Sequence, residues 1–157
     1  MARKKKQAID ELRAVMSRLR APDGCPWDQE QDHRSIRLNA VEEVYELVDA
    51  IEAGDDEEML EELGDLLLQV VFHAQMADER GAFDFDDIAQ TITDKLIRRH
   101  PHVFGDAKVK DVDGVWNQWD AIKQTEKVGT ANERKSAFDG IPRHLPALMR
   151  AHEVAKK

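Results

Sequence analysis

Residues 59–77, MLEELGDLLLQVVFHAQMA, decide the fold of this chain. Their main apolar stripe follows the three-four spacing of an α-helix and comprises Met59, Leu63, Leu66, Leu67, Val70, Ala74 and Ala77. On the opposite face, Leu68, Phe72 and Met76 continue the line that begins at Asp65. Because a helix that is apolar on both faces is buried on both sides, the acidic residues of its first half are expected to border a second packed interface.

The remaining sequence also has helical periodicity, so the chain is predicted to be all-α. Helices are expected over residues 9–19, 35–53, 55–80, 84–100 and 112–127, with a short one after Pro146. Ser35 is the expected cap of the second helix, while Gly54 and Gly81 mark the ends of the second and third. Residues 21–34 and 101–110 are expected to be loops, because proline interrupts the helical pattern there.

A chain of 157 residues is long enough for one hydrophobic core, because roughly 70% of the unfolded surface is buried in a domain of this size. The predicted organisation is a basic tail over residues 1–8, followed by a single helical domain over residues 9–157. Within that domain, the polar and glycine-containing segment 128–142 is expected to be a mobile loop.

The chain carries 23 Lys and Arg against 32 Asp and Glu, a formal net charge of −9. Binding to a nucleic-acid backbone needs a basic surface, and a helix that spans a bilayer needs an apolar run of roughly 18 residues, which the sequence lacks. Neither nucleic acid nor a membrane is therefore an expected partner. Cys25 is the single cysteine, which excludes an internal disulfide and fits a reducing cytoplasm.

The acidic residues include two similar motifs, formed by Glu42, Glu43 and Glu46 and by Glu61, Glu62 and Asp65. Residues three apart lie on one face of a helix, so each motif supplies a pair of carboxylates that two antiparallel helices could bring together. Four carboxylates at one place repel one another unless a cation lies among them. Oxygen ligands of this kind favour Mg²⁺, Mn²⁺ or Ca²⁺ over Zn²⁺. The alternative is a solvated acidic face, the usual state of charged residues on helices.

Basic and aromatic residues follow further along the chain. The fourth helix ends with Lys95, Arg98 and Arg99. They could contact phosphate groups, or they could be there simply because the helix dipole favours cations at a helix C-terminus. Trp119 and Lys123 are one turn apart, so a base could stack on the indole while the ammonium meets phosphate. A core tryptophan beside a surface lysine is the alternative.

Three further features also have two interpretations. Trp27, in a loop bounded by prolines, is either a lid residue or part of the core. Glu30-x-x-His33 has the spacing of a di-iron bundle motif, but it occurs once and in an expected loop. His73 is flanked by apolar residues, which is more typical of a hydrogen-bonded core histidine than of a ligand.

Four longer segments occur in a characteristic order: GCPWD (24–28), EEVYELVDAI (42–51), EELGDLLLQV (61–70) and KLIRRHPHVF (95–104). In these segments the chain resembles the MazG family of nucleoside triphosphate pyrophosphohydrolases, over most of its length from about Ile9 to Ala155. The resemblance implies an all-α bundle completed by dimerisation, as a homodimer or a dimer of dimers. It also implies hydrolysis of a nucleoside triphosphate to a monophosphate and pyrophosphate.

The resemblance also implies roles for individual residues by their position in these motifs. Mg²⁺, which Mn²⁺ could replace, is expected to be bound by Glu43, Glu46, Glu62 and Asp65. Outer-shell or general-base roles are expected for Glu42 and Glu61. Contacts to the nucleotide are expected from Lys95, Arg99, Trp119 and Lys123.

Many chains of this family carry two copies of the domain, and this sequence resembles the N-terminal copy alone. Catalytic competence of that copy is a separate question from its ability to bind metal. A helical dimer that binds nucleotide or metal without turnover is therefore the alternative function. A ferritin-like di-iron protein is a further alternative, which the single Glu30-x-x-His33 motif disfavours.

Overall fold

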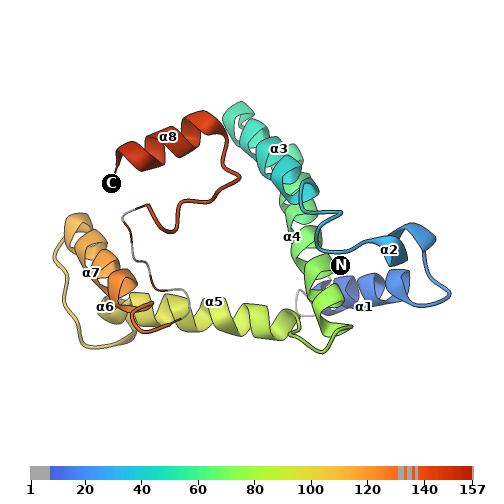
Figure 1. Ribbon diagram of the computed structural model, residues 1–157, viewed down its shortest axis with the longest axis horizontal. Helices are drawn as coiled ribbons and strands as arrows, with labels where there is room; N and C mark the ends of the chain where they lie inside the picture. The colour runs from blue at the N-terminus through green and yellow to red at the C-terminus, as the bar shows by residue number, and fades with distance from the viewer. Residues whose placement is uncertain (1–7, 131–132, 134–135, 137, 157) are drawn as a thin grey trace. The chain divides into compact units, whose positions relative to one another are not determined.

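The computed structural model describes residues 8–130, 133, 136 and 138–156, and within this part of the chain all regular structure is helical. The helices are α1 (Ala8–Arg20), α2 (Pro26–Glu30), α3 (Asn39–Ala53), α4 (Asp56–Asp78), α5 (Phe85–Arg99), α6 (Pro101–Phe104), α7 (Val112–Thr125) and α8 (Ala147–Ala155) (Figure 1). The predicted all-α class is confirmed. The expected basic tail lies outside the described residues except for Ala8, as does part of the expected loop 128–142.

Residue contacts divide the chain into two compact units, unit 1 over residues 1–92 and unit 2 over residues 93–157. The division falls within α5, so that helix contributes its first part to unit 1 and its last part to unit 2. Each unit is described by itself. Among the described residues, no helix has the length and apolar character that crossing a membrane requires.

The centre of unit 1 is an antiparallel hairpin formed by α3 and α4 (Figure 1). Gly54 ends α3 with a φ of 68°, a left-handed conformation in which glycine has no steric penalty. The carboxylate of Asp55 then caps α4 by accepting hydrogen bonds from the backbone N–H groups of Glu57 and Glu58, at 3.0 and 3.1 Å. This short connection folds α4 back along α3 and sets the pairing of their side chains.

The core of unit 1 lies on the other side of α4, where α1 packs. Its buried side chains are Met16, Ile36, Val71, Phe72 and Met76. The expectation that α4 is buried on both of its apolar faces is met only in part within one chain. The line through Phe72 and Met76 is buried, whereas Leu63, Leu67 and Val70 of the main stripe are 36 to 48% exposed.

Three local expectations were wrong. Residues 21–34 contain the short helix α2, because Pro26 occupies its first turn, where the missing N–H costs nothing. Ser35 does not cap α3, since its hydroxyl instead accepts from the backbone N–H of Asp32 at 2.9 Å, and α3 begins at Asn39. Residues 101–110 likewise contain a short helix, α6, which Pro101 begins in the same way.

In unit 2, α7 follows the predicted range closely and ends at Thr125. Asp111 caps it by accepting a hydrogen bond from the backbone N–H of Gly114 at 2.8 Å. The short terminal helix expected after Pro146 is present as α8. The end of α5 carries Lys95 and Arg99, and α7 carries Trp119 and Lys123, the four residues for which nucleotide contacts are predicted.

Candidate metal centre

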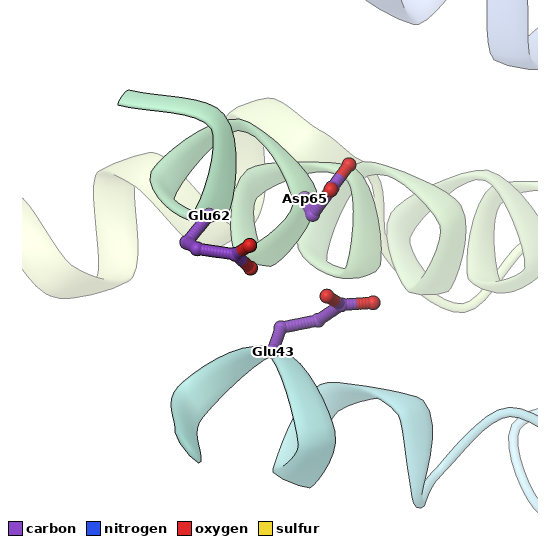
Figure 2. Close-up of side chains that lie close together, drawn as sticks. All are labelled: Glu43, Glu62 and Asp65. Carbon is purple, nitrogen blue, oxygen red and sulfur yellow. The ribbon is translucent and has the colours of Figure 1, made fainter. Parts of the chain in front are cut away.

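Three carboxylates from the α3–α4 hairpin meet in unit 1. Figure 2 shows Glu43 reaching from α3 toward α4, which carries Glu62 and Asp65. One oxygen of each residue lies within 4.8 Å of the others. We call these three residues the carboxylate centre. They are three of the four residues for which the sequence predicts metal ligation.

The carboxylate centre is partly withdrawn from water. Glu62 is only 8% exposed, and its Oε2 is buried with no hydrogen-bond partner among the described residues. Burial, followed by the repulsion of Glu46 and Glu58, raises the pKa of Glu62. Burial, followed by the charge of Asp65, raises the pKa of Glu43 as well. Both carboxylates therefore lack a sufficient counter-charge among the described residues.

The sequence did not single out Gln69 for this site. Gln69 lies one helical turn after Asp65 on α4 and is 7% exposed. Its Nε2 donates a hydrogen bond to Oε1 of Glu43 at 3.2 Å. The available signal was its position four residues after a predicted ligand, which places both side chains on one face of the helix.

The other predicted acidic residues lie around this centre and not within it. Glu46 is exposed on α3 and lines a shallow pocket with Asp49, Asp55 and Glu58. Its charge acts on both Glu43 and Glu62, although none of its oxygens belongs to the three-residue group. Glu42 and Glu61, the expected outer-shell groups or bases, are exposed and directly precede Glu43 and Glu62 in the sequence.

The donor set fits a hard divalent cation. All three side chains offer oxygen, which Mg²⁺ and Mn²⁺ prefer over the nitrogen and sulfur ligands typical of Zn²⁺. No ion pair joins any of the three to a basic side chain in the described part of the chain. A buried carboxylate oxygen without a partner is costly, and a cation at this position would supply what Glu62 lacks.

The predicted nucleotide contacts lie in unit 2, where Arg99 and Lys123 both contact Trp119. The guanidinium carbon of Arg99 and the ammonium of Lys123 each lie 4.9 Å from the ring centroid of Trp119. Trp116 meets the same indole edge-on, with centroids 5.9 Å apart. Lys95 is half-buried one turn before Arg99 on α5 and does not belong to this contact.

Arg99 is also engaged by a residue that the sequence did not suggest. Its Nη2 donates to Oε2 of Glu126 at 2.5 Å and its Nε donates to Oε1 at 3.0 Å. Arg98 donates to the same Oε1 through its Nε, also at 3.0 Å. We call Arg98, Arg99 and Glu126 the arginine clamp. The hydrogen bond from Arg99, together with that from Arg98 and the charges of both, lowers the pKa of Glu126 to about 2.

The remaining candidates have structural contacts. Trp27 is 56% exposed, with its ring centroid 6.4 Å from that of Phe72. His33 and His73 are stacked, with their Nδ1 atoms 2.8 Å apart, and Nη2 of Arg80 lies 3.0 Å from Nε2 of His33. Both ring nitrogens of His33 are thus engaged, which disfavours the di-iron interpretation. His73 is hydrogen bonded as expected but half-buried.

Fold and site together define an all-α protein with a carboxylate centre suited to a divalent cation. The MazG nucleotide pyrophosphohydrolase domain matches residues 31–104, a span that contains the whole carboxylate centre. The solved structure titled crystal structure of mazG-related protein from Thermotoga maritima has a similar fold, with a TM-score of 0.60 and 22% identity, covering 73% of this chain and 97% of that one.

Curated relatives are more similar in sequence. The chain is 51% identical to the nucleoside triphosphate pyrophosphohydrolase of Escherichia coli K12, over 95% of this chain and 56% of that protein. It is 47% identical to the nucleoside triphosphate pyrophosphohydrolase/pyrophosphatase MazG of Thermotoga maritima, over 93% of this chain and 54% of that protein. The chain belongs to the MazG family, and it spans about half the length of these two relatives.

Proposed function

We propose that this protein is a Mg²⁺-dependent nucleoside triphosphate pyrophosphohydrolase, which converts NTPs or dNTPs and water to the monophosphate and pyrophosphate. The observation that carries the proposal is the carboxylate centre, three acidic side chains with a buried and unpartnered Oε2 on Glu62. Relatives named for this activity support it.

In this proposal the ligands are Glu43, Glu62 and Asp65, joined by Glu46 from the neighbouring turn of α3. Mg²⁺, or Mn²⁺ in its place, would neutralise phosphate charge and lower the pKa of a bound water. The exposed carboxylate of Glu42 or Glu61 accepts the proton of the attacking water. A bond forms between that water oxygen and the α-phosphorus, and the bond from the α-phosphorus to the bridging oxygen breaks.

The nucleotide contacts are proposed to come from unit 2. The indole of Trp119 stacks on the base, which explains how a platform of this kind accepts more than one base. Lys95 and Lys123 supply positive charge for the phosphates. Arg99 is largely occupied by Glu126, so we assign it the task of holding Trp119 in place through their cation–π contact.

We also propose a homodimer, or a dimer of dimers. Large apolar side chains on α3, namely Val41, Val44, Tyr45, Val48 and Ile51, are 44 to 54% exposed. On α4, Leu63, Leu67 and Val70 are exposed as well. Apolar surface on two packed helices is typical of an interface. Light scattering on the purified chain should give at least twice the mass of 17.9 kDa.

We also propose a cytoplasmic location, which fits a nucleotide substrate and the single Cys25.

The activity is tested by incubating the protein with ATP and dATP in Mg²⁺ and identifying the products. We expect pyrophosphate and the monophosphate, no release of inorganic phosphate, and loss of activity in Asp65→Ala. Phosphate as the product, or full activity in Asp65→Ala, would overturn the proposed chemistry.

A second candidate is a helical module that binds nucleotide or metal without turnover. It is favoured by the chain's spanning only about half of its relatives' length, since further parts of those proteins could carry the activity. Nucleotide binding in calorimetry without pyrophosphate release would select it.

A further inference from the structure

Gln69 is the one neutral side chain hydrogen bonded to the carboxylate centre among the described residues. It is 7% exposed, and its two polar atoms have different environments. Nε2 donates to Glu43 at 3.2 Å, whereas Oε1 is buried and has no partner in the described part of the chain. Buried amide oxygens are almost always hydrogen bonded, so a donor to Oε1 of Gln69 is expected.

The chemistry of the contact fixes the orientation of the amide. An ionised carboxylate offers only acceptors, so the NH₂ group of Gln69 must face Glu43 and its oxygen must face elsewhere. The oxygen and nitrogen of an amide are about 2.3 Å apart, which keeps Oε1 within roughly 5.5 Å of Oε1 of Glu43. An unsatisfied acceptor therefore lies at the edge of the carboxylate centre.

We propose that Gln69 is a positioning residue with two tasks, holding Glu43 through its NH₂ group and accepting a hydrogen bond from a water molecule at the carboxylate centre through Oε1. Water is the donor that fits, because the other functional side chains of the centre are acceptors that cannot supply a proton when ionised. The proposal rests on the proposed function, which places a cation and a reacting water at this centre.

Each task has a physical consequence. Fixing Glu43 limits the rotamers of a ligand before the cation arrives, so less conformational entropy is lost on binding. An acceptor for one proton of the water orients its lone pair for attack on phosphorus, and orientation of a nucleophile contributes to rate. Neither task adds charge to a centre that already carries three acidic groups.

The test is Gln69→Met, which keeps length and volume but removes both polar atoms. Gln75→Met is the matched control, because Gln75 lies on the same helix and donates to Glu79 at the same 3.2 Å, away from the centre. Mn²⁺ binding is measured from the free Mn²⁺ signal in electron paramagnetic resonance, without nucleotide. Unfolding in urea is measured without metal, and pyrophosphate release is measured at saturating Mn²⁺.

We expect Gln69→Met to weaken Mn²⁺ binding about tenfold or more, as is typical for residues that orient metal ligands. Its stability without metal should be unchanged or increased, because an unsatisfied buried acceptor is gone. Its kcat should remain reduced when Mn²⁺ is saturating. Gln75→Met should leave Mn²⁺ affinity and kcat as in the unmodified chain.

A purely structural role makes the opposite prediction, lower stability without metal and unchanged Mn²⁺ affinity, and that result would overturn the proposal. Full recovery of kcat at saturating Mn²⁺ would overturn the second task alone. Failure of the proposed function is distinguishable, because it would appear in the unmodified chain as Mn²⁺ binding without pyrophosphate release.

Discussion

The arginine clamp of unit 2 and the carboxylate centre of unit 1 both withdraw charged side chains from water, but only the arginine clamp contains its own counter-charge. In the arginine clamp, the side chains of Arg99 and Glu126 are 9% and 12% exposed, and three hydrogen bonds join the guanidinium to the carboxylate. In the carboxylate centre, Glu62 is 8% exposed and faces two further acids. Arg99 thus has a counter-charge beside it, whereas the carboxylate centre has none in the described part of the chain.

Whether a buried charge has a counter-charge beside it distinguishes a structural role from a functional role better than residue type does. A buried pair with matched hydrogen bonds is part of the fold, and removing one member leaves the other uncompensated. A buried group of like charges works against the fold, so it indicates a ligand of opposite charge. An arginine at the end of a helix or a glutamate in its middle can have either role, and the partner distinguishes the two.

The largest effect is expected from Glu62→Gln, which removes one of the three acidic groups from the carboxylate centre. We expect NTP hydrolysis to fall about a thousandfold, the equivalent of roughly 4 kcal/mol of lost transition-state stabilisation. The free energy of unfolding without metal should increase at pH 7, because a buried charge has been removed. Glu52→Gln, at an exposed position on α3, is the control. A less stable metal-free variant would mean that Glu62 has a partner within the protein.

Next is Glu126→Leu, which removes the counter-charge from the arginine clamp. An unpaired Arg99 at 9% exposure should cost about 3 kcal/mol of unfolding free energy, measured by urea denaturation followed through tryptophan fluorescence. The double variant Glu126→Leu with Arg99→Met should recover most of this loss, because no buried charge remains. If the double variant is no more stable than the single one, the pair is not what stabilises unit 2.

The two clusters should also respond to pH in opposite directions. The pKa values of Glu43 and Glu62 are raised above 4.5. Without metal, their contribution to stability is therefore most favourable below pH 4.5 and becomes less favourable as the pH rises through their folded-state pKa values. The pKa of Glu126 is lowered from 4.5 to about 2, so its contribution is complete above 4.5 and declines as pH falls toward 2.

Urea midpoints between pH 7 and 3 test these signs. Glu62→Gln should flatten the dependence above pH 4.5 and Glu126→Leu the dependence below it. A profile that neither variant alters would show that other groups dominate.

Features of the fold and of the site could be predicted from the sequence when they depend on residues that lie close together in the chain. The helices other than α2 and α6 were predictable because periodicity is a local property of the sequence. Glu43, Glu62 and Asp65 were predicted as a group because regular spacing on two helices joined by a short turn leaves few ways to pair them.

Gln69 and Glu126 were missed because their significance depends on a partner far away in sequence. The residues of the contact between Gln69 and Glu43 are 26 apart, and those of the contact between Glu126 and Arg99 are 27 apart. A single sequence gives a glutamine in an apolar run and a glutamate near a helix end no distinguishing feature. The start of α3 was missed for a different reason, since Ser35 satisfies a nearby turn in competition with the helix.

The smallest expected effect distinguishes the two arms of the arginine clamp. Arg98 and Arg99 both donate to Glu126, but Arg98 is 53% exposed. An exposed pair is worth about 0.5 kcal/mol or less, so Arg98→Met should barely change the urea midpoint, and this small loss should vanish at high salt because salt screens exposed charges. Arg99→Met should cost several times more, because Glu126 then loses its buried partner and Trp119 loses one of its two cation–π contacts. Equal losses in the two variants would mean that solvent reaches both arms alike, and unit 2 would then contain no buried charge pair to set against the carboxylate centre.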